Sequence, residues 1–167
     1  ACLNLLVEVG LPRDNIVVCD RNGVIYKGRK EGMDPYKEKY ANDTNARSLN
    51  DALEGADVFL GLSGPNMVTA DMASTMADAP LIMALANPTP EIMPSEAKKG
   101  KPDCIVCTGR SDFTNQVNNV LCFPFLFRGA LDVGATAINE EMKIACVNAI
   151  AALARKEVTP EVAAIYP

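Results

Sequence analysis

Polar side chains that could hold a small ligand are concentrated in one stretch of this chain. Thr108 to Asp112, and then Gln116, Asn118 and Asn119, form a dense polar run between apolar segments. Side-chain amides donate and accept hydrogen bonds without carrying charge, so adjacent asparagines can bind a carboxylate or a sugar hydroxyl. A solvated loop does not need so many amides. The pattern therefore favours a ligand site at Asn118 and Asn119 over a plain surface loop.

Three smaller groups of candidate residues each come at the end of an apolar run. They are Asp20 with Arg21, Ser63 with Gly64, and Asn87. Such runs are typical of buried strands, and open parallel sheets bind their ligands at the carboxyl ends of the strands. Glycine lets a backbone approach a ligand closely, and the proline after Asn87 keeps that residue out of helical geometry. Each group also fits an ordinary turn or cap, so both interpretations stay open at this point.

Asp20 has a more specific interpretation. An acid at a strand end, about 20 residues beyond a glycine-rich loop, accepts hydrogen bonds from the adenosine ribose of a dinucleotide. Counting back from Asp20 places that loop just before Ala1, where the chain opens on an apolar helix without an N-cap signal. We therefore expect the first strand and the glycine-rich loop to precede these residues. Asp20 favours NAD, whereas Arg21 could pair with the 2′-phosphate of NADP, and the residues do not decide between the two.

The composition excludes several kinds of site. The 167 residues contain no histidine, so they cannot form a Ser-His-Asp or Cys-His catalytic group. A net charge of −5 argues against a nucleic-acid partner, and no apolar run is long enough to cross a membrane. Five of the six cysteines lie in apolar stretches, which predicts free thiols and a cytoplasmic protein. Cys104 and Cys107 have the spacing of a redox or zinc pair, but without a second pair or a histidine we expect them in the core.

Segments with the patterns of strands and helices alternate along the chain. We expect strands at residues 15–20, 57–62, 80–86 and 104–108, and the main helices at 1–9, 48–53, 69–77, 125–133 and 138–156, the last capped by Thr136. The strands are apolar throughout, which is typical of a parallel sheet covered by helices on both faces. The sequence thus predicts one α/β domain over residues 1–167. It should be Rossmann-like and doubly wound, with a mostly parallel sheet that lacks its first strand and glycine-rich loop.

The polar motifs, taken together, resemble those of a known family. Leu85 to Glu91, Thr108 to Asp112 and Asn115 to Pro124 closely resemble bacterial malic enzymes. The segments Asp20 to Arg29 and Phe127 to Met142 are similar to the same family. The resemblance implies an NAD(P)-dependent malate dehydrogenase of the oxaloacetate-decarboxylating type. Such an enzyme converts (S)-malate to pyruvate and carbon dioxide with NAD or NADP and a divalent Mg²⁺ or Mn²⁺.

The resemblance also implies roles for individual residues. It places Asn87 beside both substrate and nicotinamide, and Asn118 and Asn119 against malate or the nicotinamide ribose. Asp20, with Arg21 next to it, would contact the cofactor ribose, and Ser63 and Gly64 would belong to the cofactor loop. The family's catalytic tyrosine and lysine and its metal-binding carboxylates lie upstream of the glycine-rich loop. We therefore expect no catalytic residue and no metal ligand within this chain.

Further expectations concern the chain as a whole. We expect the isolated chain to be inactive and weakly stable, and the complete enzyme to be a homo-oligomer with malate and pyruvate as its small-molecule partners. Two alternatives stay open. One is another Rossmann-type dehydrogenase domain, of the amino-acid or methylene-folate kind, and the other is a nucleotide-binding module without catalysis.

Overall fold

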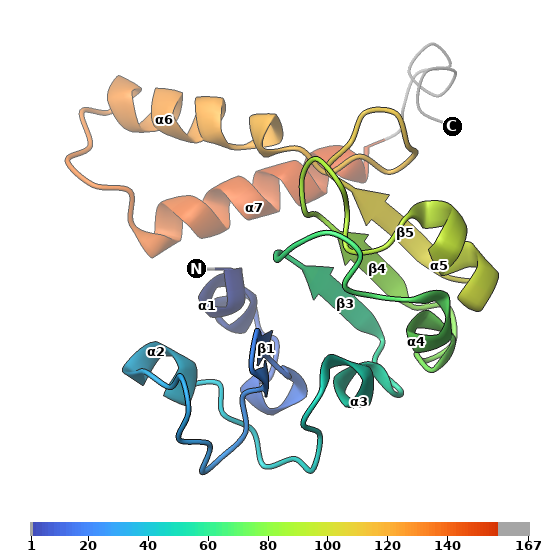
Figure 1. Ribbon diagram of the computed structural model, residues 1–167. Helices are drawn as coiled ribbons and strands as arrows, with labels where there is room; N and C mark the ends of the chain where they lie inside the picture. Colours follow the sequence, from blue (N-terminus) through green and yellow to red (C-terminus); the bar gives the residue numbers. More distant parts are fainter. Residues whose placement is uncertain (1, 157–167) are drawn as a thin grey trace. The chain divides into compact units, whose positions relative to one another are not determined.

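The computed structural model describes residues 2–156 of the chain (Figure 1). The chain divides into two compact units. One is Pro12–Val117, and the other combines Ala1–Leu11 with Asn118–Pro167.

A three-stranded parallel sheet forms the centre of the first unit. Its strands are β3 (Val58–Gly61), β4 (Leu81–Ala84) and β5 (Ile105–Thr108), in the order β3-β4-β5. Parallel neighbours need a crossover connection, and the helices α4 (Ala70–Ser74) and α5 (Pro94–Gly100) lie in the two crossovers. This alternation confirms the predicted Rossmann-like α/β fold with a parallel sheet.

The core of this unit lies between one face of the sheet and the crossover helices. Figure 1 shows α4 and α5 next to each other against the sheet. Gly100 faces the backbone of Ala70, where an added Cβ would overlap the Ala70 carbonyl, so glycine permits this close packing. The buried apolar cluster consists of Leu53, Phe59, Val68, Ala73, Met76, Ile82, Ala84, Ile92, Ala97, Cys104 and Val106.

The first predicted strand, residues 15–20, is wrong for most of its length. Only β1 (Cys19–Asp20) is extended and paired, and it forms an antiparallel hairpin with β2 (Gly23–Val24) outside the parallel sheet. The backbone carbonyls ahead of it have hydrogen-bond partners outside the parallel sheet. The Ile16 carbonyl accepts a hydrogen bond from Asn42 Nδ2 at 2.6 Å, and the Val18 carbonyl accepts one from the Ile25 N–H at 2.7 Å. Apolar composition predicted a strand here, but this backbone bonds to Asn42 and Ile25 instead of a parallel neighbour.

Short helices complete the first unit. They are the 3₁₀ turn η1 (Arg13–Asn15), α2 (Pro35–Glu38) and α3 (Leu49–Leu53). Ser48 begins α3 as predicted. Its hydroxyl accepts a hydrogen bond from the Asp51 N–H, and the Asp51 carboxylate accepts one from the Ser48 N–H, which together make a capping box.

The second unit is helical in its described part. It contains α1 (Cys2–Glu8), the 3₁₀ turn η2 (Asn119–Leu121), α6 (Phe123–Asp132) and α7 (Glu140–Ala154). The predicted cap of the last helix is wrong. Asn139 begins α7 and accepts a hydrogen bond from the Met142 N–H at 3.0 Å, so the helix starts one turn after Thr136. No helix among residues 2–156 is long and apolar enough to cross a membrane.

Candidate functional site

A buried carboxylate joins the loops that follow β3 and β4. Glu91 is fully buried, and its Oε1 accepts a hydrogen bond from the Ser63 N–H at 2.8 Å. Its Oε2 accepts one from the Ala86 N–H at 3.0 Å. One side chain therefore holds the ends of two neighbouring parallel strands, where ligands of such sheets bind.

Backbone contacts reinforce this connection. The Pro90 carbonyl accepts a hydrogen bond from the Asn66 N–H at 3.1 Å, and the Glu91 carbonyl accepts one from the Val68 N–H at 3.0 Å. Gly61, at the end of β3, leaves room for the carboxylate, because an added Cβ would lie only 2.5 Å from Glu91 Cδ. The loop after β3 is thus tied along its length to Pro90 and Glu91.

Sequence reasoning missed the role of Glu91. Glu91 belongs to the loop before α5, which begins at Pro94. A signal was present, since an acid lies next to Ile92 and Met93 rather than in a polar stretch. The two N–H groups that bind Glu91 are 28 and 5 residues away along the chain. Because they are backbone groups, no side-chain type in the sequence identifies them as its partners.

Three of the predicted site residues lie at this edge of the sheet. Ser63, Gly64 and Asn87 follow β3 and β4, as predicted. Asn87 is exposed, and its side-chain amide makes no hydrogen bond with any other residue among 2–156. An added Cβ at Gly64 would meet open space, so the backbone there is accessible. The edge therefore offers a free amide and an open backbone to a ligand.

The loop after β5 reaches the same edge. Arg110 donates a hydrogen bond to the Pro88 carbonyl at 3.2 Å and is paired with Asp112. Farther along, the Val117 N–H donates to the Thr108 carbonyl at 2.8 Å. The loops after all three strands are therefore connected, the first two through Glu91 and the last two through Arg110.

Asp20 and Arg21 lie apart from the sheet, on the β1–β2 hairpin. Arg29 Nη2 contacts both Asp20 oxygens at 2.8 Å, Lys37 Nζ contacts Oδ2 at 2.7 Å, and the Asn22 N–H donates to Oδ1 at 2.8 Å. A carboxylate has about four acceptor positions, and these four contacts use them. Arg21 is exposed and has no ion pair with a described residue.

The same contacts set the protonation of Asp20. Burial raises its pKa, but the hydrogen bonds from Lys37, Arg29 and the Asn22 N–H outweigh that effect and lower the pKa to about 2. Arg29 is itself buried and also donates to the Gly23 and Val24 carbonyls, so the ion pair is part of the hairpin's own structure.

Asn118 and Asn119 belong to the second unit. Both are exposed, and Asn118 Oδ1 accepts a hydrogen bond from the Val120 N–H at 3.0 Å, which caps η2. This cap occupies one oxygen position and leaves the Nδ2 donor of Asn118 free of described partners. The side chain of Asn119 makes no hydrogen bond within residues 2–156.

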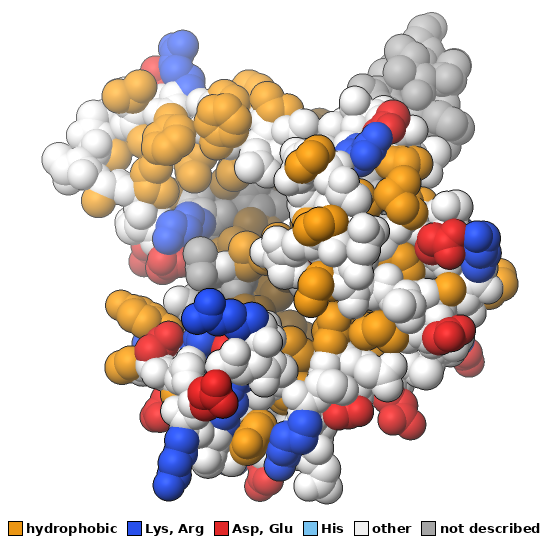
Figure 2. Space-filling model, in the orientation of Figure 1, with side chains coloured by type: hydrophobic (Ala, Val, Ile, Leu, Met, Phe, Trp, Pro, Cys, Tyr) orange, Lys and Arg blue, Asp and Glu red, His pale blue; other side chains and the backbone are white. Residues whose placement is uncertain are grey.

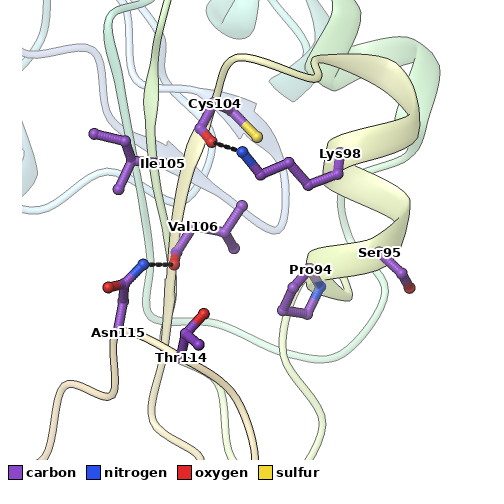
Figure 3. A pocket seen from close by; sticks show the side chains of 8 residues that line it. All are labelled: Pro94, Ser95, Lys98, Cys104, Ile105, Val106, Thr114 and Asn115. Atoms are coloured by element: carbon purple, nitrogen blue, oxygen red, sulfur yellow. Dashed lines mark hydrogen bonds between the residues drawn. The ribbon is translucent and has the colours of Figure 1, made fainter. Parts of the chain in front are cut away.

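A cavity of about 350 Å³ lies elsewhere in the first unit, between α5 and β5 (Figure 3). Lys98 donates to the Cys104 carbonyl and Asn115 donates to the Val106 carbonyl, at 3.1 Å for the second. Both side chains satisfy carbonyl groups on the outer edge of β5. None of the predicted site residues lines this cavity, and Lys98 and Asn115 are engaged with the strand backbone.

The chain is similar to known proteins of one family. Residues 7–167 match the family model of the malic enzyme NAD-binding domain. The chain is 62% identical to an NADP-dependent malic enzyme of Escherichia coli and 58% identical to an NAD-dependent malic enzyme of Rhizobium meliloti. Both matches cover 99% of this chain but only 22% of the relative, so the chain spans about a fifth of their length.

Solved structures give the same result. A putative malic enzyme (malate oxidoreductase) is similar with a TM-score of 0.79 at 35% identity, over 93% of this chain and 40% of that one. The NAD-dependent malic enzyme of Thermotoga maritima is similar with a TM-score of 0.70 at 38% identity, over 77% of this chain and 34% of that one.

Proposed function

Since this chain belongs to the malic enzyme family, as part of its NAD-binding domain, we propose that the complete protein converts (S)-malate to pyruvate and carbon dioxide while reducing NAD(P)⁺. The observation that carries the proposal is the free amide of Asn87, which follows β4, at the same edge of the sheet as the open backbone of Gly64, which follows the neighbouring strand β3. The similarity to malic enzymes favours this function over an amino-acid or methylene-folate dehydrogenase and over a module without catalysis.

In this proposal the residues of this chain bind and orient. Ser63 and Gly64 would present backbone to the cofactor, and Asn87 would hold the nicotinamide and malate against each other. Asn118 and Asn119 would donate to malate or to the nicotinamide ribose, for which Asn118 keeps its Nδ2 donor. When bound, NAD(P)⁺ accepts hydride from C2 of malate, and the divalent cation polarises the keto oxygen as carbon dioxide leaves.

We place the Mg²⁺ or Mn²⁺ ligands outside this chain. No group of three Cys, Asp or Glu side chains within residues 2–156 could hold a metal ion. The resemblance assigns the metal-binding carboxylates and the proton-transferring residues to segments upstream of these 167 residues. The isolated chain should therefore have no malic enzyme activity.

The charges around Asp20 favour NADP as the cofactor. Two cations, Arg29 and Lys37, already neutralise Asp20, and Arg21 adds an exposed positive charge. An NAD ribose hydroxyl would need an open acceptor on Asp20, whereas a 2′-phosphate would find cations. In our proposal, Asp20 therefore does not touch the ribose directly. It holds the cations that would contact the 2′-phosphate.

We also propose that the complete protein is a cytoplasmic homo-oligomer and that both units form a single NAD(P)-binding domain. The family match runs across both units, and the six cysteines are free thiols. Light scattering of the complete protein tests the assembly, and a monomeric mass would contradict it.

The decisive experiment is a malate-dependent assay of the complete protein with Mn²⁺, run in parallel with NADP⁺ and NAD⁺. We expect pyruvate to form in step with cofactor reduction, and NADP⁺ to have the lower KM. The isolated 167-residue chain is the matched control and should be inactive. If a folded, metal-loaded protein reduces neither cofactor, the proposed function is wrong.

A further inference from the structure

Glu91 is a buried carboxyl group without a cationic partner among the described residues. It is 0% exposed, and no Lys or Arg within residues 2–156 forms an ion pair with it. Its partners are the N–H groups of Ser63 and Ala86, with the Ser63 hydroxyl farther away at 3.4 Å. Burying a carboxylate costs free energy that such hydrogen bonds only partly offset, and an apolar side chain would avoid that cost. The presence of a carboxyl group here therefore indicates that its two acceptor oxygens are needed at these positions.

That geometry is a fixed spacing between two loops. Each oxygen of Glu91 binds one loop, Oε1 the one after β3 and Oε2 the one after β4. Residue 63 precedes the open backbone of Gly64, and residue 86 precedes the free amide of Asn87. The side chain thus acts directly beside both groups that face a ligand, while it is itself closed off from solvent.

We propose that Glu91 is a positioning residue that sets the Gly64 backbone and the Asn87 amide at the separation a bound dinucleotide requires. This inference rests on the proposed function. Glu91 is too deeply buried to touch the ligand, so its effect passes through the two N–H groups that it holds.

The inference can be tested by a substitution that replaces only one of the two acceptor oxygens of Glu91. Glu91→Gln keeps the shape but turns one oxygen into an NH₂ group, which cannot accept a hydrogen bond. Whichever way the amide turns, either the Ser63 or the Ala86 N–H loses its partner. Glu91→Asp keeps both acceptors and the charge but withdraws them by one methylene group.

The experiment measures NADP⁺ and NAD⁺ binding to the complete protein by calorimetry, with KM and kcat from the malate assay. For E91Q we expect the Kd and KM of the preferred dinucleotide to rise about tenfold, as loss of one buried hydrogen bond implies. E91D should also raise both values, because its carboxylate is withdrawn from both N–H groups. Glu96→Gln, the same change in an exposed ion pair of α5, should leave both values unchanged.

A second control separates positioning from stability. Ile92→Val removes one methylene group from the neighbouring core residue and should lower the Tm without changing dinucleotide affinity. If E91Q lowers the Tm but leaves Kd and KM at the wild-type values, Glu91 is only structural and the inference is wrong. If E91Q does not fold, E91D decides, and an unchanged Kd overturns the inference. A wild-type protein that binds neither dinucleotide would overturn the proposed function and this inference together.

Discussion

Asp20 links the structure of the β1–β2 hairpin to the cofactor choice that we propose. Arg29, Lys37 and the Asn22 N–H occupy its acceptor positions, so it draws two cations to one end of the β1–β2 hairpin. In our proposal, the acid that a dinucleotide-binding fold offers to a ribose is used here to hold two cations. Both consequences, for stability and for cofactor choice, can be measured.

The first prediction concerns stability at acidic pH. The pKa of Asp20 is lowered from 3.8 to about 2 in the folded chain, so the contribution of Asp20 is complete above its unfolded pKa. As the pH falls from about 4 to about 2, the unfolded chain binds the proton first, and the free energy of unfolding decreases by up to about 2 kcal/mol.

Urea unfolding of the wild type and of Asp20→Asn across that range measures this contribution. The difference between them should shrink as the pH falls through the folded pKa of about 2. Asp43→Asn, at an exposed position, is the control and should follow the wild type. A difference between wild type and Asp20→Asn that stays constant with pH would refute the prediction.

The second prediction concerns Lys37 and cofactor choice in the complete protein. Lys37→Gln removes a cation and also vacates one acceptor position on Asp20. We expect the KM for NADP⁺ to rise by about tenfold to a hundredfold and the KM for NAD⁺ to stay level or fall, since a ribose hydroxyl could then bind Asp20. Lys39→Gln, two residues away and exposed, is the control. Equal changes for both cofactors would show that Lys37 acts on the fold alone.

At the residue scale, positions at strand ends were predictable and tertiary partners were not. Ser63, Gly64 and Asn87 follow apolar runs, and the strands β3 and β4 end at Gly61 and Ala84, shortly before those runs end at residues 62 and 86. The hydrogen-bond partners of Asp20 and Glu91 depend on how separate segments pack. The sequence around Arg29 or Ala86 does not indicate these contacts.

At the scale of elements, the parallel strands were predictable because each is apolar and bounded by turns. The segment at residues 15–20 has the same composition but is not in the sheet, since its carbonyls bond to Asn42 and Ile25. Apolar composition indicates that a segment tends to be buried, but it does not show whether a neighbouring strand is available for pairing. The cap of α7 moved from Thr136 to Asn139 because either residue type can cap a helix, and the sequence alone does not choose between them.

A thiol pair links two elements of the second unit and gives the third prediction. Cys122 precedes α6, Cys146 lies within α7, and their Sγ atoms are 3.4 Å apart. A disulfide needs about 2.05 Å, so a small shift would allow one to form. We expect hydrogen peroxide to oxidise one thiol to a sulfenic acid with release of water, and the other thiol to displace a second water.

Burial, together with the hydrogen bond to Cys122, raises the pKa of Cys146. The reaction should therefore accelerate as the pH rises, since the thiolate reacts. Peptide mapping after peroxide treatment should find Cys122 joined to Cys146, with the total number of free thiols reduced by two. Cys146→Ser should form no such link, and Cys107→Ser should behave as the wild type. A link that forms equally well between other cysteines would refute the prediction.

At the scale of the whole molecule, large apolar side chains are exposed in both units among the described residues. Val58 and Ile105 lie in register on the sheet face opposite the buried core residues, and each is 54% exposed. In the second unit, Phe125 is 70% and Leu131 78% exposed on α6, where Figure 2 shows apolar side chains gathered. Parallel sheets are normally covered on both faces, so these surfaces are suited to contact with further protein.

The last prediction follows from that surface. We expect the isolated 167-residue chain to self-associate at micromolar concentration, because water is excluded when such faces meet. The double variant Val58→Lys/Ile105→Lys places two charges on the sheet face without entering the core, and it should shift the chain towards the monomer. Light scattering across a dilution series measures both. The control is Lys30→Glu, a charge change at an exposed position of the hairpin region, which should not alter association. If the wild-type chain is monomeric throughout the series, the exposed faces do not drive assembly, and the homo-oligomer that we propose would need contacts from elsewhere in the complete protein.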